Sequence, residues 1–108
     1  MLLTIKTDGL RFRAAGRAWR KQVKGQDAVT RDGRPVWKVK LHAIDDARET
    51  TEDIWVEIAG DEPVLPHESD VQLDGLLFAP WVNRKGEIVR AFRVLAITPQ
   101  EAAASKSA

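Results

Sequence analysis

In the stretch Val36-Trp37-Lys38-Val39-Lys40-Leu41-His42-Ala43, apolar and polar side chains alternate from Trp37 to Ala43. Alternation with a period of two is typical of a β-strand that has one buried and one exposed face. The side chains predicted to face the core are Trp37, Val39, Leu41 and Ala43. The opposite face then presents two lysines and a histidine, namely Lys38, Lys40 and His42.

Three segments that follow also show β-type patterns. Residues 54–58 alternate, with Trp55 and Glu57 on the outer side. Residues 71–79 begin with alternation and then become apolar on both faces, and Gly75 at the change predicts a bulge or a sharp bend. Residues 88–97 form a long β-type run after the loop 83–87, which predicts a hairpin.

Residues 10–24 fit two patterns. As a strand, they separate a face with Leu10 and Phe12 from a face with several arginines. As a helix, they carry an apolar stripe that includes Phe12 and Trp19. Gly16 and the lack of a helical neighbour favour the strand. Either structure gathers arginines on one side.

Five strands without a convincing long helix predict an all-β fold, a small five-stranded barrel like the oligonucleotide/oligosaccharide-binding (OB) fold. The connection 59–70 contains two prolines, so the helix between strands three and four is predicted to be reduced or absent. A small sandwich and an SH3-like barrel are the alternatives. Residues 1–97 are predicted to form one domain and residues 98–108 a flexible tail.

Composition excludes several classes of protein. The 108 residues include no cysteine and no apolar run long enough for a membrane span, and the first residues are too short for a signal peptide. We therefore expect a cytoplasmic protein with no membrane contact. The two histidines lack metal-ligand spacing, and no serine lies in a nucleophile context, so no enzyme activity, metal site or cofactor is expected.

Charge is sorted along the chain, although the net value is only +1. Residues 1–48 hold twelve cations against five acids, a net +7. Residues 49–76 hold nine acids and no lysine or arginine, and residues 77–108 have a net +3. Such asymmetry is either a solvated surface with clustered signs or the footprint of a polyanion. The acidic segment 49–76 is expected to lie mainly away from nucleic acid or to recruit a basic partner, for which a replication or transfer protein is the candidate.

An OB barrel binds oligonucleotides across strands two and three, between the 1–2 and 4–5 loops. Phosphates require cations and unpaired bases require aromatic faces. Both residue types occur in these regions. The predicted nucleic-acid-binding residues are Lys24, Arg31 and Arg34 in the 1–2 loop, Lys38 and Lys40 on strand two, Trp55 on strand three, Trp81 just before the 4–5 loop, and Arg84 and Lys85 in that loop.

Each tryptophan also has a structural interpretation. Trp37 shares a face with core residues and is assigned to the core. Trp81 follows Pro80 and either plugs a barrel end or contacts the ligand. Trp55 either stacks on a base or packs beneath a loop or a second protomer, and Trp19 depends on the structure of residues 10–24.

Residues 26–97 resemble actinobacterial plasmid replication, integration and excision activators of the Pra type. The resemblance runs through residues 30–41, the Asp45-Asp46 turn, residues 57–66 with their spaced prolines, and residues 71–82, which include Gly75-Leu76-Leu77-Phe78-Ala79-Pro80-Trp81. It ends with Gly86 and residues 90–96, and Trp81 stands where the family tends to have tyrosine. These proteins belong to integrative and conjugative elements. More distantly, the layout is similar to helicase-processivity factors related to single-stranded-DNA-binding OB domains.

The leading hypothesis is therefore a non-enzymatic OB-like protein that binds single-stranded DNA, with RNA as an alternative, during plasmid or mobile-element replication or transfer. The competing hypothesis is an adaptor that regulates excision or replication through a protein partner without touching DNA. A duplex-binding transcriptional activator ranks third, because no major-groove helix is evident. A homo-oligomer is compatible with the sequence.

Overall fold

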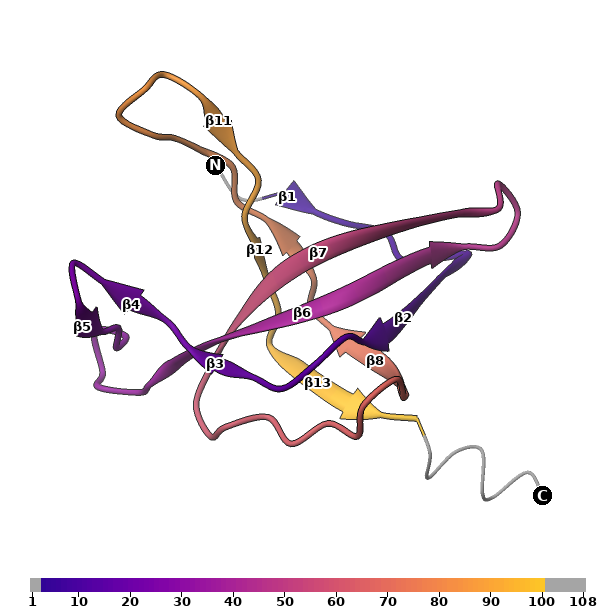
Figure 1. The fold of residues 1–108 in the computed structure, drawn as a ribbon, viewed down its shortest axis with the longest axis horizontal. Coiled ribbons are helices and arrows are strands. Elements are labelled where there is room, and N and C mark those ends of the chain that lie inside the picture. Colours follow the sequence, from indigo (N-terminus) through magenta and orange to yellow (C-terminus); the bar gives the residue numbers. More distant parts are fainter. Residues whose placement is uncertain (1–2, 101–108) are drawn as a thin grey trace.

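Every regular element in the computed structural model, which describes residues 3–100, is a β-strand (Figure 1). The all-β fold class is therefore confirmed. The connection between Ala59 and Asp70 contains no helix, as its two prolines predicted. No helix capable of crossing a membrane is found in the described part of the chain.

Two strands have ten residues, two have five, and the others have two to four. Their bounds are β1 Leu3–Thr4, β2 Leu10–Ala14, β3 Trp19–Arg20, β4 Gln22–Val23, β5 Gln26–Asp27, β6 Val36–Asp45, β7 Thr50–Ala59, β8 Asp70–Asp74, β9 Leu77–Phe78, β10 Trp81–Val82, β11 Ile88–Val89, β12 Phe92–Arg93 and β13 Ala96–Pro99.

The centre of the fold is the antiparallel hairpin of β6 and β7, ten residues in each strand. Val39 and Leu41 on β6, and Val56 on β7, are completely buried, which confirms the period-two pattern. Their neighbours on the strands point to the other face. Trp37 was assigned to the core from the sequence, but it belongs neither to the buried cluster nor to the apolar residues packed against it. It is half-buried beyond the core, where its indole N–H donates a hydrogen bond to the carbonyl of Gly60 at 3.1 Å.

Residues 10–24 form strands, as Gly16 favoured, but only 10–14 form a regular one. β2 pairs with β6 on one side and with β8 on the other, and its Phe12 and Ala14 are buried. After Gly16 the chain pairs again with β6 through the short strand β3. The chain then leaves the main sheet and forms the small hairpin β4–β5.

The two C-terminal segments, 70–78 and 92–99, are each interrupted in the middle. Gly75 has φ +68°, a conformation that favours glycine, and it produces the bend that the sequence predicted. Leu76 and Val94 turn inward at the interruptions and are buried in the core. The segment 92–99 begins in parallel pairing with β7 and ends in antiparallel pairing with β8.

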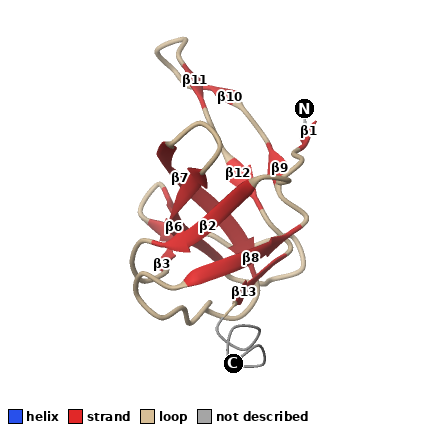
Figure 2. Ribbon diagram, turned by 90° about the vertical axis from the view of Figure 1, so that its right-hand side faces the viewer, coloured by secondary structure: helices blue, strands red, loops and turns tan. Residues whose placement is uncertain are grey.

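The barrel predicted from the sequence is not closed. The main sheet follows the order β1-β9-β12-β7-β6-β2-β8-β13, with β1 and β13 at its two ends. The predicted run 88–97 is divided into β11, β12 and the start of β13. The second break falls at residues 94 and 95, where the backbone passes from a hydrogen bond with Glu57 of β7 to one with Asp74 of β8 and the side chain of Val94 enters the core. The curved sheet nevertheless wraps one core, to which β2, β6, β7 and β8 all contribute (Figure 2).

The predicted start of the C-terminal tail at residue 98 can be compared with the described chain. β13 extends to Pro99 and pairs with Val71, so residues 98 and 99 belong to the sheet rather than to a tail. Gln100 donates its backbone N–H to the carbonyl of Asp70 at 2.9 Å, and the rest of the predicted tail, 101–108, lies outside the described residues. Two hairpins, β4–β5 and β10–β11, project from the sheet (Figure 1).

Candidate nucleic-acid interface

The outward faces of β6 and β7 carry polar and aromatic side chains in register. Lys38 lies opposite Glu57, and Lys40 lies opposite Trp55. The parallel strand β12 adds Arg93 beside Glu57. Residues directly opposite each other on paired strands share one face of the sheet. The fold therefore places these five side chains on one surface.

A groove of about 530 Å³ crosses this surface between the two projecting hairpins. One wall comes from the residues that lead into β4, the floor comes from β6 and β7, and the other wall comes from the strands that flank the β10–β11 loop. Three of the predicted binding residues line it together: Lys38, Trp55 and Trp81. The predicted strands two and three, which are β6 and β7, therefore meet the predicted 4–5 hairpin, β10–β11, in one groove.

The tryptophans of the groove are exposed rather than packed. Trp55 is 45% exposed and Trp81 is 54% exposed, so Trp81 does not plug the end of a barrel. The Lys38 ammonium lies 5.5 Å from the centroid of the Trp55 ring, within cation–π range. The groove therefore offers aromatic surface and positive charge side by side.

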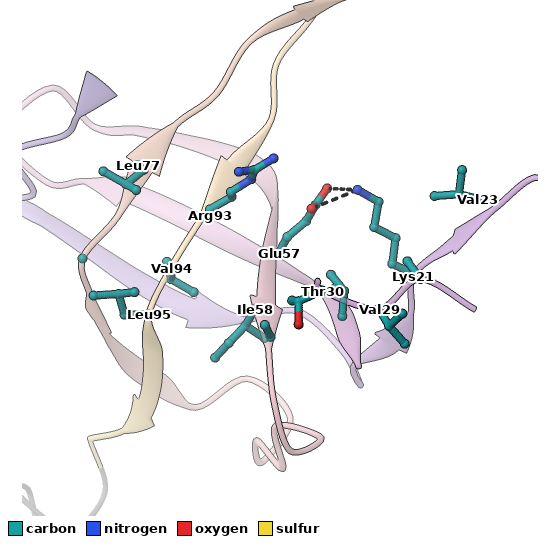
Figure 3. Close-up of a pocket in the computed structure, with 14 residues that line it drawn as sticks. Lys21, Val23, Val29, Thr30, Glu57, Ile58, Leu77, Arg93, Val94 and Leu95 are labelled. Atoms are coloured by element: carbon teal, nitrogen blue, oxygen red, sulfur yellow. Dashed lines mark hydrogen bonds and ion pairs between the residues drawn. The ribbon is translucent and has the colours of Figure 1, made fainter. Parts of the chain in front are cut away.

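An ion pair between Lys21 and Glu57 lies in the groove, which both residues line. The Lys21 ammonium contacts both carboxylate oxygens of Glu57, at 3.0 and 2.9 Å, and both side chains are largely buried. On its far side lies a second, mostly apolar pocket of about 450 Å³, lined by residues such as Val29, Ile58 and Leu77 (Figure 3). Lys21, Glu57 and Arg93 line both this pocket and the region beside Trp81.

The remaining predicted cations flank the groove. Lys24 lies at the tip of β4–β5, Arg31 and Arg34 lie in the turn before β6, and Arg84 and Lys85 lie in the loop that ends β10–β11. All five are exposed. Arg34 is paired with Asp32 at 3.1 Å, whereas the other four form no ion pair within residues 3–100. The loop 83–87 is held by the side chain of Asn83, which accepts hydrogen bonds from the backbone N–H groups of residues 85 and 87.

Lys40 is on the predicted face, but its charge is already matched. Its ammonium lies 3.5 Å from a carboxylate oxygen of Asp53. The ring of His42 donates to the other oxygen of the same carboxylate at 2.6 Å. This hydrogen bond, with a smaller contribution from Lys40, holds the pKa of Asp53 below its ordinary value. Lys40 therefore adds little free positive charge to the groove.

The acidic segment 49–76 lies in part on the predicted binding face, although eight of its nine acids do not line the groove. Glu57 is inside the groove region, and Trp55 of the same segment lines it. Four of its acids pair with cations from other parts of the chain: Glu52 with Arg90, Asp53 with Lys40, Glu57 with Lys21, and Asp70 with Arg13. Charges that are separated along the sequence are thus interleaved across strands in space.

Sequence reasoning missed three residues of the site, Lys21, Glu57 and Arg93. The alternation of residues 54–58 already placed Glu57 on the side of Trp55, which was a usable signal. Lys21 follows the irregular chain after Gly16, and Arg93 depends on the parallel pairing of β12 with β7, neither of which has a local signature. Within residues 3–100 no three potential metal ligands gather in one place.

Comparison of the chain with models of known protein families, with curated proteins and with solved structures finds no match.

Proposed function

We propose that this protein binds single-stranded nucleic acid, largely without sequence preference, in the groove between the hairpins β4–β5 and β10–β11. The observation that carries the proposal is that exposed Trp55 and Trp81 line one groove together with Lys38, which has no carboxylate partner among the described residues. Bases stack on exposed aromatic faces, and the backbone follows cations.

The surroundings of the groove support the same function. The hairpins on both sides carry exposed cations, Lys24 on one and Arg84 and Lys85 on the other. The curved, incompletely closed sheet resembles the partly open barrel of OB domains, which bind oligonucleotides on this face. The resemblance to Pra-type activators supplies the setting that we propose, the replication or transfer of a mobile element.

The proposal is tested by titrating oligo(dT) into the protein at low salt while following tryptophan fluorescence and the mobility of the labelled oligonucleotide. We expect quenching and a shift, both of which weaken steeply as salt rises. The absence of both would overturn the proposal and favour the protein-interaction adaptor. Competition by duplex DNA that exceeds competition by single strands would favour the transcriptional activator instead.

Replacing both Arg84 and Lys85 with glutamate is expected to weaken oligo(dT) binding roughly tenfold. The slope of the logarithm of the binding constant against the logarithm of the salt concentration is expected to fall in magnitude by about 1.4, because each phosphate contact of a single strand releases about 0.7 of a counterion. The measurement is fluorescence anisotropy over a salt series. Arg48→Glu is the matched control, since Arg48 is exposed in the turn between β6 and β7, outside the groove. An unchanged slope would remove the β10–β11 loop from the interface.

Replacing Glu57 with glutamine is expected to tighten oligo(dT) binding by about threefold to tenfold at low salt, because it removes a negative charge near the phosphates and frees Lys21. Glu62→Gln is the control, since Glu62 is an exposed acid of the connection before β8. Equal affinities of the Glu57→Gln variant and the unmodified protein would mean that the phosphates do not pass this carboxylate.

A further inference from the structure

We infer that the binding path continues past the groove onto Trp19 of β3, which forms a third stacking position with the guanidinium of Arg17 lying on it. This inference rests on the proposed function, because it extends the same path. It makes Trp19 and Arg17 contact residues for single-stranded nucleic acid.

Strand pairing brings Trp19 onto the face of the groove. β3 pairs with β6 so that Trp19 lies directly opposite Lys38, and opposed residues of an antiparallel pair share one face. Lys38 in turn lies over the Trp55 ring at 5.5 Å. Lys38 therefore stands between two tryptophans, one on β3 and one on β7. The face carries an aromatic group, a cation and a second aromatic group across three neighbouring strands.

Trp19 is not needed by the core. Its side chain is 50% exposed, and it is absent from the cluster of buried apolar residues and from those that pack against it. The Arg17 guanidinium carbon lies 4.0 Å from the centroid of its ring, and Arg17 forms no ion pair with the acids of residues 3–100. Arginine stacked on an indole holds the ring in place and keeps its N–H donors available for phosphate.

The side chains of the face that carries Trp19, Lys38 and Trp55 favour a nucleic-acid strand as the ligand. Paired strands lie about 4.8 Å apart, so the alternation of ring and cation repeats over a short distance. A polymer with a flat group and a negative charge in each repeat unit matches this alternation, and a nucleic-acid strand is such a polymer. Arg17 and Lys38 supply the positive charge on either side of Trp19.

The experiment compares Trp19→Ala with the unmodified full-length protein on labelled oligo(dT) of about 5 and about 15 nucleotides, lengths that bracket most of the range covered by OB domains. We expect the long oligonucleotide to lose roughly 5-fold to 150-fold in affinity, the range for one lost stacked base. The short oligonucleotide, which the groove alone can hold, is expected to change little. Arg17→Lys, which keeps the charge but loses the planar stack, is expected to weaken the long oligonucleotide by a smaller factor.

Val64→Ala is the matched control, because Val64 is an exposed apolar residue on the connection before β8. Equal affinities of Trp19→Ala and the unmodified protein for both lengths would overturn the inference while leaving the proposed function intact. A change of sedimentation behaviour without a change in affinity would assign Trp19 to a contact between protomers, and would overturn it as well. If the unmodified protein binds neither length, the proposed function and this extension fall together.

Discussion

Replacing both Trp55 and Trp81 with alanine is expected to weaken oligo(dT) binding by about 30-fold to 10⁴-fold, since each stacked base contributes about 1–3 kcal/mol. Both rings are half-exposed and line one groove, so the double variant removes the aromatic surface of the groove while the cations of its loops stay in place. The dissociation constant is measured by anisotropy at one fixed salt concentration.

The matched control is the double phenylalanine variant, which keeps a flat ring at each position and is expected to retain most of the affinity. Because neither tryptophan belongs to the core, the alanine variant is expected to unfold at nearly the same urea concentration as the unmodified protein. Unchanged affinity in a folded alanine variant would contradict stacking in this groove. An unchanged salt slope, by contrast, is expected, since the phosphate contacts remain.

Leu41→Ala is expected to lower the free energy of unfolding by about 2–5 kcal/mol, because it leaves a cavity in a fully packed site. Leu41 lies on β6 at 0% exposure and belongs to the cluster formed with β2, β7 and β8. A loss of this size is a large share of the roughly 5–15 kcal/mol of a typical domain. The measurement is urea denaturation followed by circular dichroism, with a lower midpoint and an unchanged m-value expected.

Val64→Ala provides the comparison for Leu41→Ala, since Val64 is 81% exposed and its truncation is expected to change stability by less than about 0.5 kcal/mol. Similar losses in the two variants would contradict the position of Leu41 at the centre of the core. Where Leu41→Ala remains folded, its affinity for oligo(dT) reports how far the groove depends on a rigid β6.

The strands that could be predicted are those with a local period of two. Residues 36–43 and 54–58 show it clearly, because each strand of that hairpin buries only one face. The bend at Gly75 was also predictable from its residue type. The break between β12 and β13 was not, because there the chain passes from pairing with β7 to pairing with β8, which depends on strands distant in sequence.

The exposure of Lys38, Trp55 and Trp81, which line one groove, was predictable because strand alternation and a hairpin place them on the outer face. The state of the charges was not predictable, since ion pairs such as Lys21 with Glu57 and Lys40 with Asp53 depend on strand register. Trp19 was undecided in the sequence for the same reason, because only the pairing of β3 with β6 shows which face it shares.

The parallel pairing of β12 with β7 has a consequence for the kinetics of folding. Phe92 must meet Val56, and Phe12 must meet Val71, so the native contacts join residues that are distant in sequence. Domains of such high contact order typically fold in milliseconds to seconds rather than microseconds. During synthesis the β6–β7 hairpin can form early, but the edge of β7 stays unpaired until the last strands leave the ribosome. We therefore expect the groove beside Trp55 to be completed at the end of folding, in the same step that covers this edge.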